Sequence, residues 1–500
     1  MAVVRHETKL SLQLIVVGLQ NALLNKRSTI QITFLMRKLF FLLFIPLGTS
    51  AQNNASLLDA YMQAQASFYN FNGNVLVAKN SHVIYQKSFG YADYATKKKL
   101  DKNSIFDCGS IAKEFTALGI LLLKDKGMIS YSDTLRKFFP ELPYADVTIR
   151  QLLTHTSGMP DGFALIEQYF DKSKIATNDD LISLLESKKP ALLFKPGEDL
   201  HYSGTAFNLL AAIIEKISGQ SYKTYMDKEV FKPLGMVHTQ VANGPRSTEK
   251  IPGYSIGFIF SDSLHKYIRA DSENTGWTSY FAGITGEGMI ITTTEDLLKW
   301  DRALKNHTLL RETTQQEMLT MHAEKKFPAV SFGYGIRVGK NEVGNYVFHN
   351  GYYPGFISMH LRYTDDDITV IVLSNNESHS EFIADALAGM TLNKKIILPY
   401  VHKPHMQIKV SDKYTGRYLM ELTRPPYMAV FPIEFVSKDD TLNIFSAYGP
   451  GIKLIPETEK KFYYANGLDE QIEFETDTTG NLLAVWQIAW GVKKKLKRLD

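Results

Sequence analysis

The sequence has a single cysteine among its 500 residues. One cysteine cannot form an internal disulfide, so no disulfide framework holds this fold, and a cysteine-rich zinc site is excluded for the same reason. A strong charge of one sign is also missing, because 56 basic residues face 52 acidic ones and the formal net charge is only +4. That balance gives no general indication of a nucleic-acid partner. With 44% hydrophobic and 22% charged residues, the composition is that of an ordinary globular protein and excludes global disorder.

The small positive excess lies at the N-terminus. Residues 1–51 carry six basic side chains and one acidic side chain, a net charge of +5, which leaves the rest of the chain at −1. Here Met36-Arg37-Lys38 is followed by nine apolar residues, Leu39–Leu47, and then by small residues before Gln52. This order is typical of a secretory signal peptide, and nine residues are too few for a membrane-spanning helix, which needs about 20. We therefore predict that residues 1–51 are a leader with a signal peptide, and that Met36 is the true start of translation. We also expect an exported bacterial protein, periplasmic or secreted, whose mature chain has no transmembrane segment.

The rest of the chain divides into two parts by its pattern of apolar residues. Residues 52–398 mix strand-like runs with helical periodicity, as in the expected hairpin of Gly73–Ala78 with His82–Phe89 and the expected helix Ile111–Lys126. Four further strands are expected, at Phe332–Val338, Tyr346–Phe348, Ile357–Arg362 and Ile368–Leu373. Residues 399–500 hold short runs rich in Tyr, Phe, Ile and Val between turns, which predicts a separate all-β module.

The motif with the clearest chemistry is Ser110-Ile111-Ala112-Lys113, at the start of the expected helix. Residues i and i+3 share a helix face, so the Lys113 amine can reach the Ser110 hydroxyl. A serine hydroxyl is a weak nucleophile and needs an adjacent base. Lysine can be that base only if burial or a nearby charge lowers its pKa. The helix N-terminus also places positive potential where an oxyanion would develop.

Two further motifs strengthen this interpretation. Tyr202-Ser203-Gly204 precedes an expected helix, and a tyrosine at that position is suited to relaying protons. His349-Asn350-Gly351 ends a strand-like run, where a glycine lets a substrate approach the backbone closely.

Taken together, these motifs resemble the serine β-lactamase and penicillin-binding-protein superfamily, in particular the class C β-lactamase-like branch with its esterases and D-amino-acid peptidases. That branch has S-x-x-K, then Y-x-N, then K-T-G or H-x-G, and this chain matches in order with Ser110/Lys113, Tyr202 and His349/Gly351. Four further segments of the body and one in the last hundred residues also match: Leu152–Gly158, Pro196–Glu198, Phe231–Met236, Gly286–Trp300 and Tyr414–Tyr418. The resemblance implies an α+β fold of the β-lactamase/transpeptidase type, with an antiparallel sheet flanked by helices and a mainly helical subdomain, followed by a small all-β C-terminal domain.

The resemblance also implies an acyl-enzyme mechanism. Ser110 would be the nucleophile, Lys113 and Tyr202 would move its proton, and the backbone N–H groups of Ser110 and Tyr352 would form the oxyanion hole. His349 and Gly351 would line the substrate side. One position departs from the family, since Gly204 stands where the pattern has an asparagine that contacts the lysine and the acyl side chain of the substrate. Asn208, one helical turn later, is a candidate to replace it.

These features predict an exported serine hydrolase that cleaves a small amide, an ester or a D-amino-acid peptide, including cell-wall-derived ones. A true β-lactamase and a non-catalytic cell-wall peptide binder on the same fold remain alternatives. No residue pattern requires a metal or an organic cofactor, and His402 and His405 are interpreted as solvated loop residues. The G-x-S-x-G match around Ser255 lacks the strand before and the helix after that a nucleophile elbow requires. His155 is expected to stabilise a turn, and Cys108 to be a buried core residue.

Overall fold

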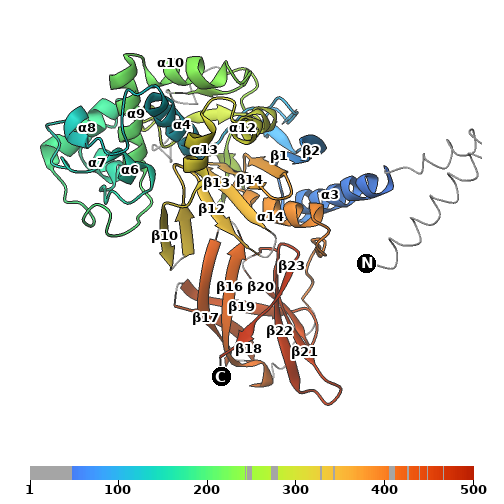
Figure 1. Ribbon diagram of the computed structural model, residues 1–500. Coiled ribbons are helices and arrows are strands. Elements are labelled where there is room, and N and C mark those ends of the chain that lie inside the picture. The colour runs from blue at the N-terminus through green and yellow to red at the C-terminus, as the bar shows by residue number, and fades with distance from the viewer. Residues whose placement is uncertain are drawn as a thin grey trace, which may run out of the picture. The chain divides into compact units, whose positions relative to one another are not determined.

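Figure 1 shows the computed structural model of the chain. It describes residues 48–242, 244, 251–271, 280–326, 329–341, 344–404, 412–424, 427–438, 440–447, 449–465 and 467–499, without the side chains of 48–53, 325, 326, 329, 330, 412, 421–424, 427–430 and 449. The chain divides into two compact units, Met1–Asn53 and Asn54–Asp500. The predicted leader up to residue 47 lies outside the described residues. Among the described helices, none has both the length and the hydrophobicity to cross a membrane.

The body of the second unit is built on an antiparallel sheet. Its strand order is β2-β1-β15-β14-β13-β12-β11-β10, and the pairing of β1 with β15 aligns Val75 with Val372. The expected hairpin is confirmed. The strands are β1 (Gly73–Lys79), β2 (His82–Phe89), β10 (Ala323–Lys326), β11 (Ala329–Phe332), β12 (Arg337–Lys340), β13 (Asn345–Tyr353), β14 (Phe356–Tyr363) and β15 (Ile368–Ser374).

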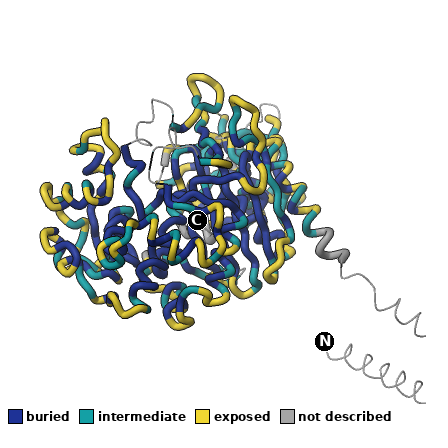
Figure 2. The backbone as a smooth tube through the Cα atoms, turned by 90° about the horizontal axis from the view of Figure 1, so that it is seen from above, coloured by how far each residue is buried: buried dark blue, intermediate teal, exposed yellow. Residues whose placement is uncertain are grey.

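Helices cover both faces of this sheet because its strands are apolar on both sides. On β1, Val75 and Val77 pack in a cluster with α3 (Gly48–Phe68) and α14 (Ser380–Thr391), whereas Leu76 and Ala78 belong to the core on the other face. Alternate side chains of a strand point to opposite faces, so a strand buried on both sides is apolar throughout. Figure 2 shows this buried interior, with the exposed residues concentrated in the peripheral turns.

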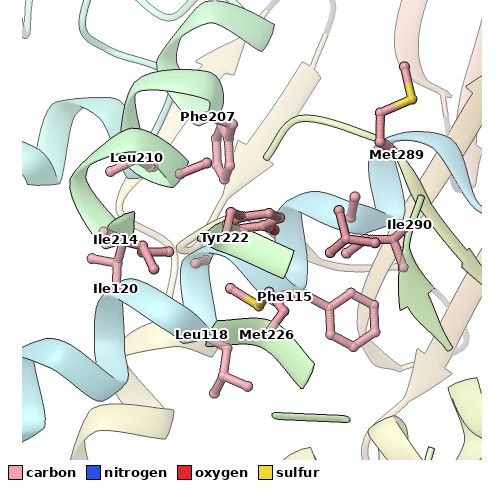
Figure 3. Packing of buried hydrophobic residues seen from close by; sticks show 14 of the residues in the cluster. Phe115, Leu118, Ile120, Phe207, Leu210, Ile214, Tyr222, Met226, Met289 and Ile290 are labelled. Carbon is pink, nitrogen blue, oxygen red and sulfur yellow. The ribbon is translucent and has the colours of Figure 1, made fainter. Parts of the chain in front are cut away.

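The second core holds the helix that carries the S-x-x-K motif, α4 (Ala112–Asp125). Its residues 112–123 are all buried, and Gly119 lets Met226 and Ile214 approach so closely that a side chain there would clash with both. Figure 3 shows Phe115, Leu118 and Ile120 of this helix among apolar side chains from other elements, such as Phe207 and Tyr222. A helix packed on every side is rigid, which suits an element that must hold catalytic groups in place.

The mainly helical subdomain that the resemblance implies is present, and the remaining elements of the body are short strands and flanking helices. The helices are α5 (Leu135–Phe138), α6 (Ile149–Leu153), α7 (Gly162–Tyr169), α8 (Asn178–Lys188), α9 (Gly204–Ser218), α10 (Tyr222–Met226) with a π-helical turn (Asp227–Phe231), α12 (Thr294–Asn306) and α13 (Glu312–Leu319). The strands are β3 (Tyr91–Asp93), β4 (Lys98–Lys99), β5 (Phe106–Asp107), β6 (Gln240–Val241), β7 (Phe258–Ser261), β8 (Lys266–Arg269) and β9 (Ile290–Thr292).

The C-terminal residues form a nearly closed antiparallel sheet, as the sequence predicts. Its pairing runs β24-β16-β17-β18-β19-β20-β21-β22-β23, around an apolar core that includes Phe435 and Phe474. The Trp490 ring of this domain stacks on Phe382 of α14 with 3.8 Å between ring centroids. The strands are β16 (Gly416–Arg424), β17 (Tyr427–Lys438), β18 (Thr441–Ser446), β19 (Gly449–Pro456), β20 (Lys461–Tyr464), β21 (Glu470–Thr476), β22 (Leu482–Ala489), β23 (Val492–Lys495) and β24 (Lys497–Arg498).

One predicted strand is wrong. The run Phe332–Val338 is not continuous, because β11 ends at Phe332 and β12 begins only at Arg337. The intervening turn contains Gly335 in the left-handed region, with φ +66°, close to the backbone of Lys113. Apolar residues around two glycines look like a strand in sequence, but here they form a turn that packs against α4.

Candidate active site

Ser110 lies at the entrance to α4, in a short 3-10 turn (Gly109–Ile111) that leads directly into the helix. The predicted pairing is present: the Lys113 ammonium donates a hydrogen bond of 3.0 Å to the Ser110 hydroxyl oxygen. Ser110 is partly exposed, whereas the Lys113 side chain is completely buried. The Ser110 hydroxyl is therefore accessible, and its partner is shielded from water.

The environment of Lys113 corrects one expectation. Besides Ser110, Nζ donates to the backbone oxygen of Glu287 at 2.7 Å and to its carboxylate oxygen Oε2 at 2.9 Å. Burial alone lowers the pKa of Lys113, but the charges of Glu287 and Tyr202 outweigh it, and the pKa is raised. An ammonium has three donors and no acceptor, so Lys113 shares its donors among Ser110, Glu287 and Tyr202 and has no lone pair to accept a proton. The lysine is thus a charged donor at rest, and not the free base that the sequence analysis required.

Glu287 is the functional residue that sequence reasoning missed. It lies between two glycines just before β9, in a segment that the sequence analysis used only as part of a resemblance. Gly286 has a φ of +99° and passes close to the Phe207 backbone oxygen of α9, where a side chain would clash. That close approach brings the carboxylate to the lysine. The acidic residue enclosed by glycines was the available signal.

Tyr202 lies beside the pair, just before α9. Its ring centroid is 5.0 Å from Lys113 Nζ, and the His155 ring lies against it at 4.5 Å. The backbone N–H of Ser203 donates to His155 Nδ1 at 3.1 Å. Burial, helped by the charge of Lys113, holds the pKa of His155 well below its usual range, so this ring is neutral and can accept that bond. His155 therefore positions the Tyr202 segment, in addition to occupying the expected turn with a φ of +59°.

The end of β13 lies directly against the turn that carries Ser110. A methyl group at Gly351 would lie 1.9 Å from the Cys108 carbonyl oxygen and 3.1 Å from the Ser110 nitrogen. From the other side, a methyl at Gly109 would lie 2.5 Å from the Tyr352 nitrogen. These two glycines let the segments that carry the Ser110 and Tyr352 N–H groups pack against each other, which the expected oxyanion hole requires.

Of two other residues predicted on the substrate side, His349 is buried and Tyr352 is exposed. The ring centroid of His349 lies 6.2 Å from that of Tyr202. Burial, together with the charges of Arg337 and Lys113, holds the pKa of His349 well below the usual range. It is therefore neutral and adds no charge to the site. The hydroxyl of Tyr352, whose ring is exposed, donates to Glu377 at 3.1 Å.

The expectation for Asn208 is wrong. Its side chain is buried, and its amide nitrogen donates to the Thr285 backbone oxygen at 2.9 Å. Because that bond holds the segment leading to Glu287, Asn208 supports the site and does not line it. A Cβ at Gly204 would instead lie 3.5 Å from Oε2 of Glu287, so the glutamate carboxylate occupies the space into which a residue-204 side chain would point.

The remaining candidates stay outside this cluster. Ser255 is fully buried and is followed by β7, so the helix that a nucleophile elbow requires is missing, as expected. Cys108 is buried, as predicted. His402 is not a solvated loop residue, since its side chain is 7% exposed, lies 3.5 Å from a Glu457 carboxylate oxygen and stacks on Tyr463. His405 lies outside the described residues. Across the described part of the chain, no group of three or more His, Cys, Asp or Glu side chains is arranged to hold a metal ion.

Comparison with known proteins agrees with this geometry. Residues 57–390 match the Beta-lactamase family. Penicillin-binding protein 4* of Bacillus subtilis is 32% identical over 432 residues, which cover 85% of this chain and 94% of that protein. The octameric penicillin-binding protein homologue of Pyrococcus abyssi superposes with a TM-score of 0.62 at 24% identity, over 88% of this chain and 99% of that one.

A third similar structure is the D-amino acid amidase of Ochrobactrum anthropi, solved with L-phenylalanine amide. It superposes with a TM-score of 0.55 at 22% identity and covers 69% of this chain and 96% of that one. At this level of identity the likeness shows the fold. The family match over most of the chain and the relative in Bacillus subtilis show the family as well. The chain belongs to the Beta-lactamase family, within the superfamily of serine β-lactamases and penicillin-binding proteins.

Proposed function

We propose that this protein is an exported serine hydrolase that forms an acyl-enzyme on Ser110 and cleaves a small amide, an ester or a D-amino-acid peptide. The observation that carries the proposal is the hydrogen bond from the buried Lys113 to Ser110, in a cluster completed by Glu287 and Tyr202. The family match and the amidase with a similar fold support a hydrolase, and the predicted leader is the support for export.

The cluster suggests how the proton moves. Ser110 Oγ attacks the substrate carbonyl carbon, and its proton passes to the phenolate oxygen of Tyr202, because the Lys113 ammonium has no lone pair to accept it. The Lys113 ammonium stabilises the phenolate. The oxyanion is bound by the N–H groups of Ser110 and Tyr352. When the intermediate collapses, the leaving group departs with the proton from Tyr202. Water then attacks the acyl-enzyme and gives a proton to Tyr202. As the bond from the acyl carbon to Ser110 Oγ breaks, Tyr202 returns this proton to Oγ, and the acid is released.

A β-lactamase and a non-catalytic cell-wall peptide binder are the alternatives. Gly204 weighs against efficient β-lactam turnover, because the asparagine that contacts the acyl side chain in the family pattern is replaced. The Ser110–Lys113 hydrogen bond weighs against a pure binder, which needs no ammonium beside its serine.

The test is a substrate panel with the purified full chain. We would compare nitrocefin, p-nitrophenyl esters and D-Ala-D-Ala peptides, and measure the covalent labelling of Ser110 by a fluorophosphonate from the intact mass. Ser110→Ala should abolish both labelling and turnover. If this variant were labelled as well as the wild type, or if the wild type formed no adduct, the assignment would be wrong.

A further inference from the structure

Compared with the family pattern, which has an asparagine at position 204, the pair of Gly204 and Glu287 offers different hydrogen-bonding groups to the acyl part of a substrate. A Cβ at position 204 would lie 3.5 Å from both Cγ and Oε2 of Glu287, and 3.2 Å from the Phe163 ring. A side chain at position 204 would therefore begin in van der Waals contact with the Glu287 carboxylate. An amide side chain there would both donate and accept hydrogen bonds, whereas an ionised carboxylate only accepts them.

The carboxylate is within reach of a bound substrate. Lys113 Nζ lies 3.0 Å from Ser110 Oγ and 2.9 Å from Glu287 Oε2, so the two oxygens are no more than about 6 Å apart. The Glu287 side chain is 17% exposed although its lysine partner is fully buried. A carboxylate offers about four lone-pair positions, and one bond to Lys113 leaves room for another donor.

The acyl group can place a donor at that distance. In an amino-acyl substrate the α-nitrogen lies only about 2.5 Å from the carbonyl carbon that Ser110 attacks. A free α-ammonium is therefore within hydrogen-bonding range of a carboxylate about 6 Å from the nucleophile. If the same nitrogen is acylated, it brings a carbonyl oxygen towards the Glu287 carboxylate, and that pair of oxygens repels.

The other charges around the cluster do not duplicate this role. Lys113 and Arg337 are the cations next to Tyr202, with Arg337 5.8 Å from its ring centroid. Glu377 is bonded to the Tyr352 hydroxyl at the oxyanion side. Of the two carboxylates, Glu287 is the one hydrogen-bonded to the catalytic lysine.

Building on the proposed function, we propose that Glu287 selects acyl donors that carry a free α-ammonium, so that the preferred substrates are amino-acid amides, esters or peptides with an unblocked amine next to the scissile carbonyl. Donors that are N-acylated at this position, including penicillins and cephalosporins, are discriminated against.

The experiment compares kcat/KM for alanine p-nitroanilide and N-acetylalanine p-nitroanilide, each as the D and the L form. The wild type should prefer the free amine at least tenfold. In Glu287→Gln, a neutral side chain of nearly the same shape, that preference should fall at least tenfold. Glu141→Gln makes the same chemical change at an exposed position and should leave the ratio unchanged. The wild-type preference should also fall above pH 8, where the α-ammonium of the substrate is lost.

The ratio separates substrate selection from support of Lys113. If Glu287 only holds the lysine, Glu287→Gln slows both substrates equally and the ratio stays constant, which overturns the proposal. As a readout independent of turnover, alaninamide should protect Ser110 from the fluorophosphonate at lower concentration than N-acetylalaninamide. If neither compound is hydrolysed or protects, or if the acetylated one is preferred, the proposal is also overturned.

The same probe distinguishes this failure from failure of the proposed function. The fluorophosphonate carries no amine, so labelling of Ser110 reports the nucleophile alone. A wild type that is not labelled refutes the hydrolase. A wild type that is labelled but shows no preference refutes only the role of Glu287.

Discussion

Replacing Gly351 with alanine should disable the oxyanion hole while leaving the nucleophile in place. Gly351 does not have a positive φ, so an alanine fits its backbone conformation, and the added methyl acts only through space. That methyl would lie 1.9 Å from the Cys108 carbonyl oxygen and 2.8 Å from its carbon. Both of these atoms are backbone and cannot rotate out of the way.

The size of the effect follows from these distances. Ordinary contact with a Cβ begins at 3.4 Å, so β13 and the Ser110 turn must separate by about 1.5 Å. A misplacement of about 1 Å in an active site costs on the order of 100-fold, and the loss of one oxyanion donor costs about 100- to 1,000-fold in kcat. Since Tyr352 follows Gly351 directly, its N–H moves with the strand. We expect kcat to fall about 100-fold or more with little change in KM.

The assay is hydrolysis of a p-nitrophenyl ester, combined with the rate of fluorophosphonate labelling and the thermal midpoint. Gly288→Ala is the matched control, because a methyl there meets nothing within 4 Å. Gly109→Ala approaches the same hole from the other side and should also reduce the rate. If Gly351→Ala remains folded and its kcat is within threefold of the wild type, the assignment of the Tyr352 N–H to the oxyanion hole is wrong.

Three further predictions concern proton transfer and the buried charges. Tyr202→Phe should lower kcat about 100- to 10,000-fold with a nearly unchanged thermal midpoint, since the ring still packs on His155; a kcat within tenfold of the wild type would contradict the relay. Lys113→Met should abolish labelling and lower the urea midpoint, because it leaves the Glu287 carboxylate unpaired. Adding Glu287→Gln should restore the midpoint but not the activity, and an unrestored midpoint would contradict the pairing. Burial lowers the pKa of His360, but Glu114 and Asp301 outweigh it and raise the pKa to about 10. Its stabilising charge is therefore fully present below pH 6.5 and is lost as the pH rises towards 10, so the urea midpoint should fall over this range in the wild type and much less in His360→Gln.

The parts of the site that are local in sequence could be predicted from it. Ser110 and Lys113 are three residues apart in one helix, so their contact follows from helix geometry. The hairpin of β1 and β2 and the buried α4 likewise carry strong local patterns. Tyr202 and His349 were found through the order of family motifs, since no local rule connects them to Ser110.

The parts that the sequence analysis missed depend on contacts between distant segments. Glu287 lies 174 residues from the lysine that it binds, and nothing in its neighbourhood indicates that partner. Asn208 was expected near the lysine by counting one helical turn from Gly204, but its amide is bonded to Thr285. The sign of the Lys113 pKa shift also required the structure, because burial lowers that pKa and the missed glutamate raises it.

The departure at Gly204 therefore has a different meaning in the structure. In sequence it is the loss of an asparagine that would contact the lysine. In the structure a carboxylate fills that space and makes the contact at 2.9 Å. The exchange has a chemical consequence, because a carboxylate keeps the lysine charged, whereas an amide leaves burial free to lower its pKa. If the proposed function holds, we expect Gly204 and Glu287 to act together, with the combined effect of assigning the proton of Ser110 to Tyr202.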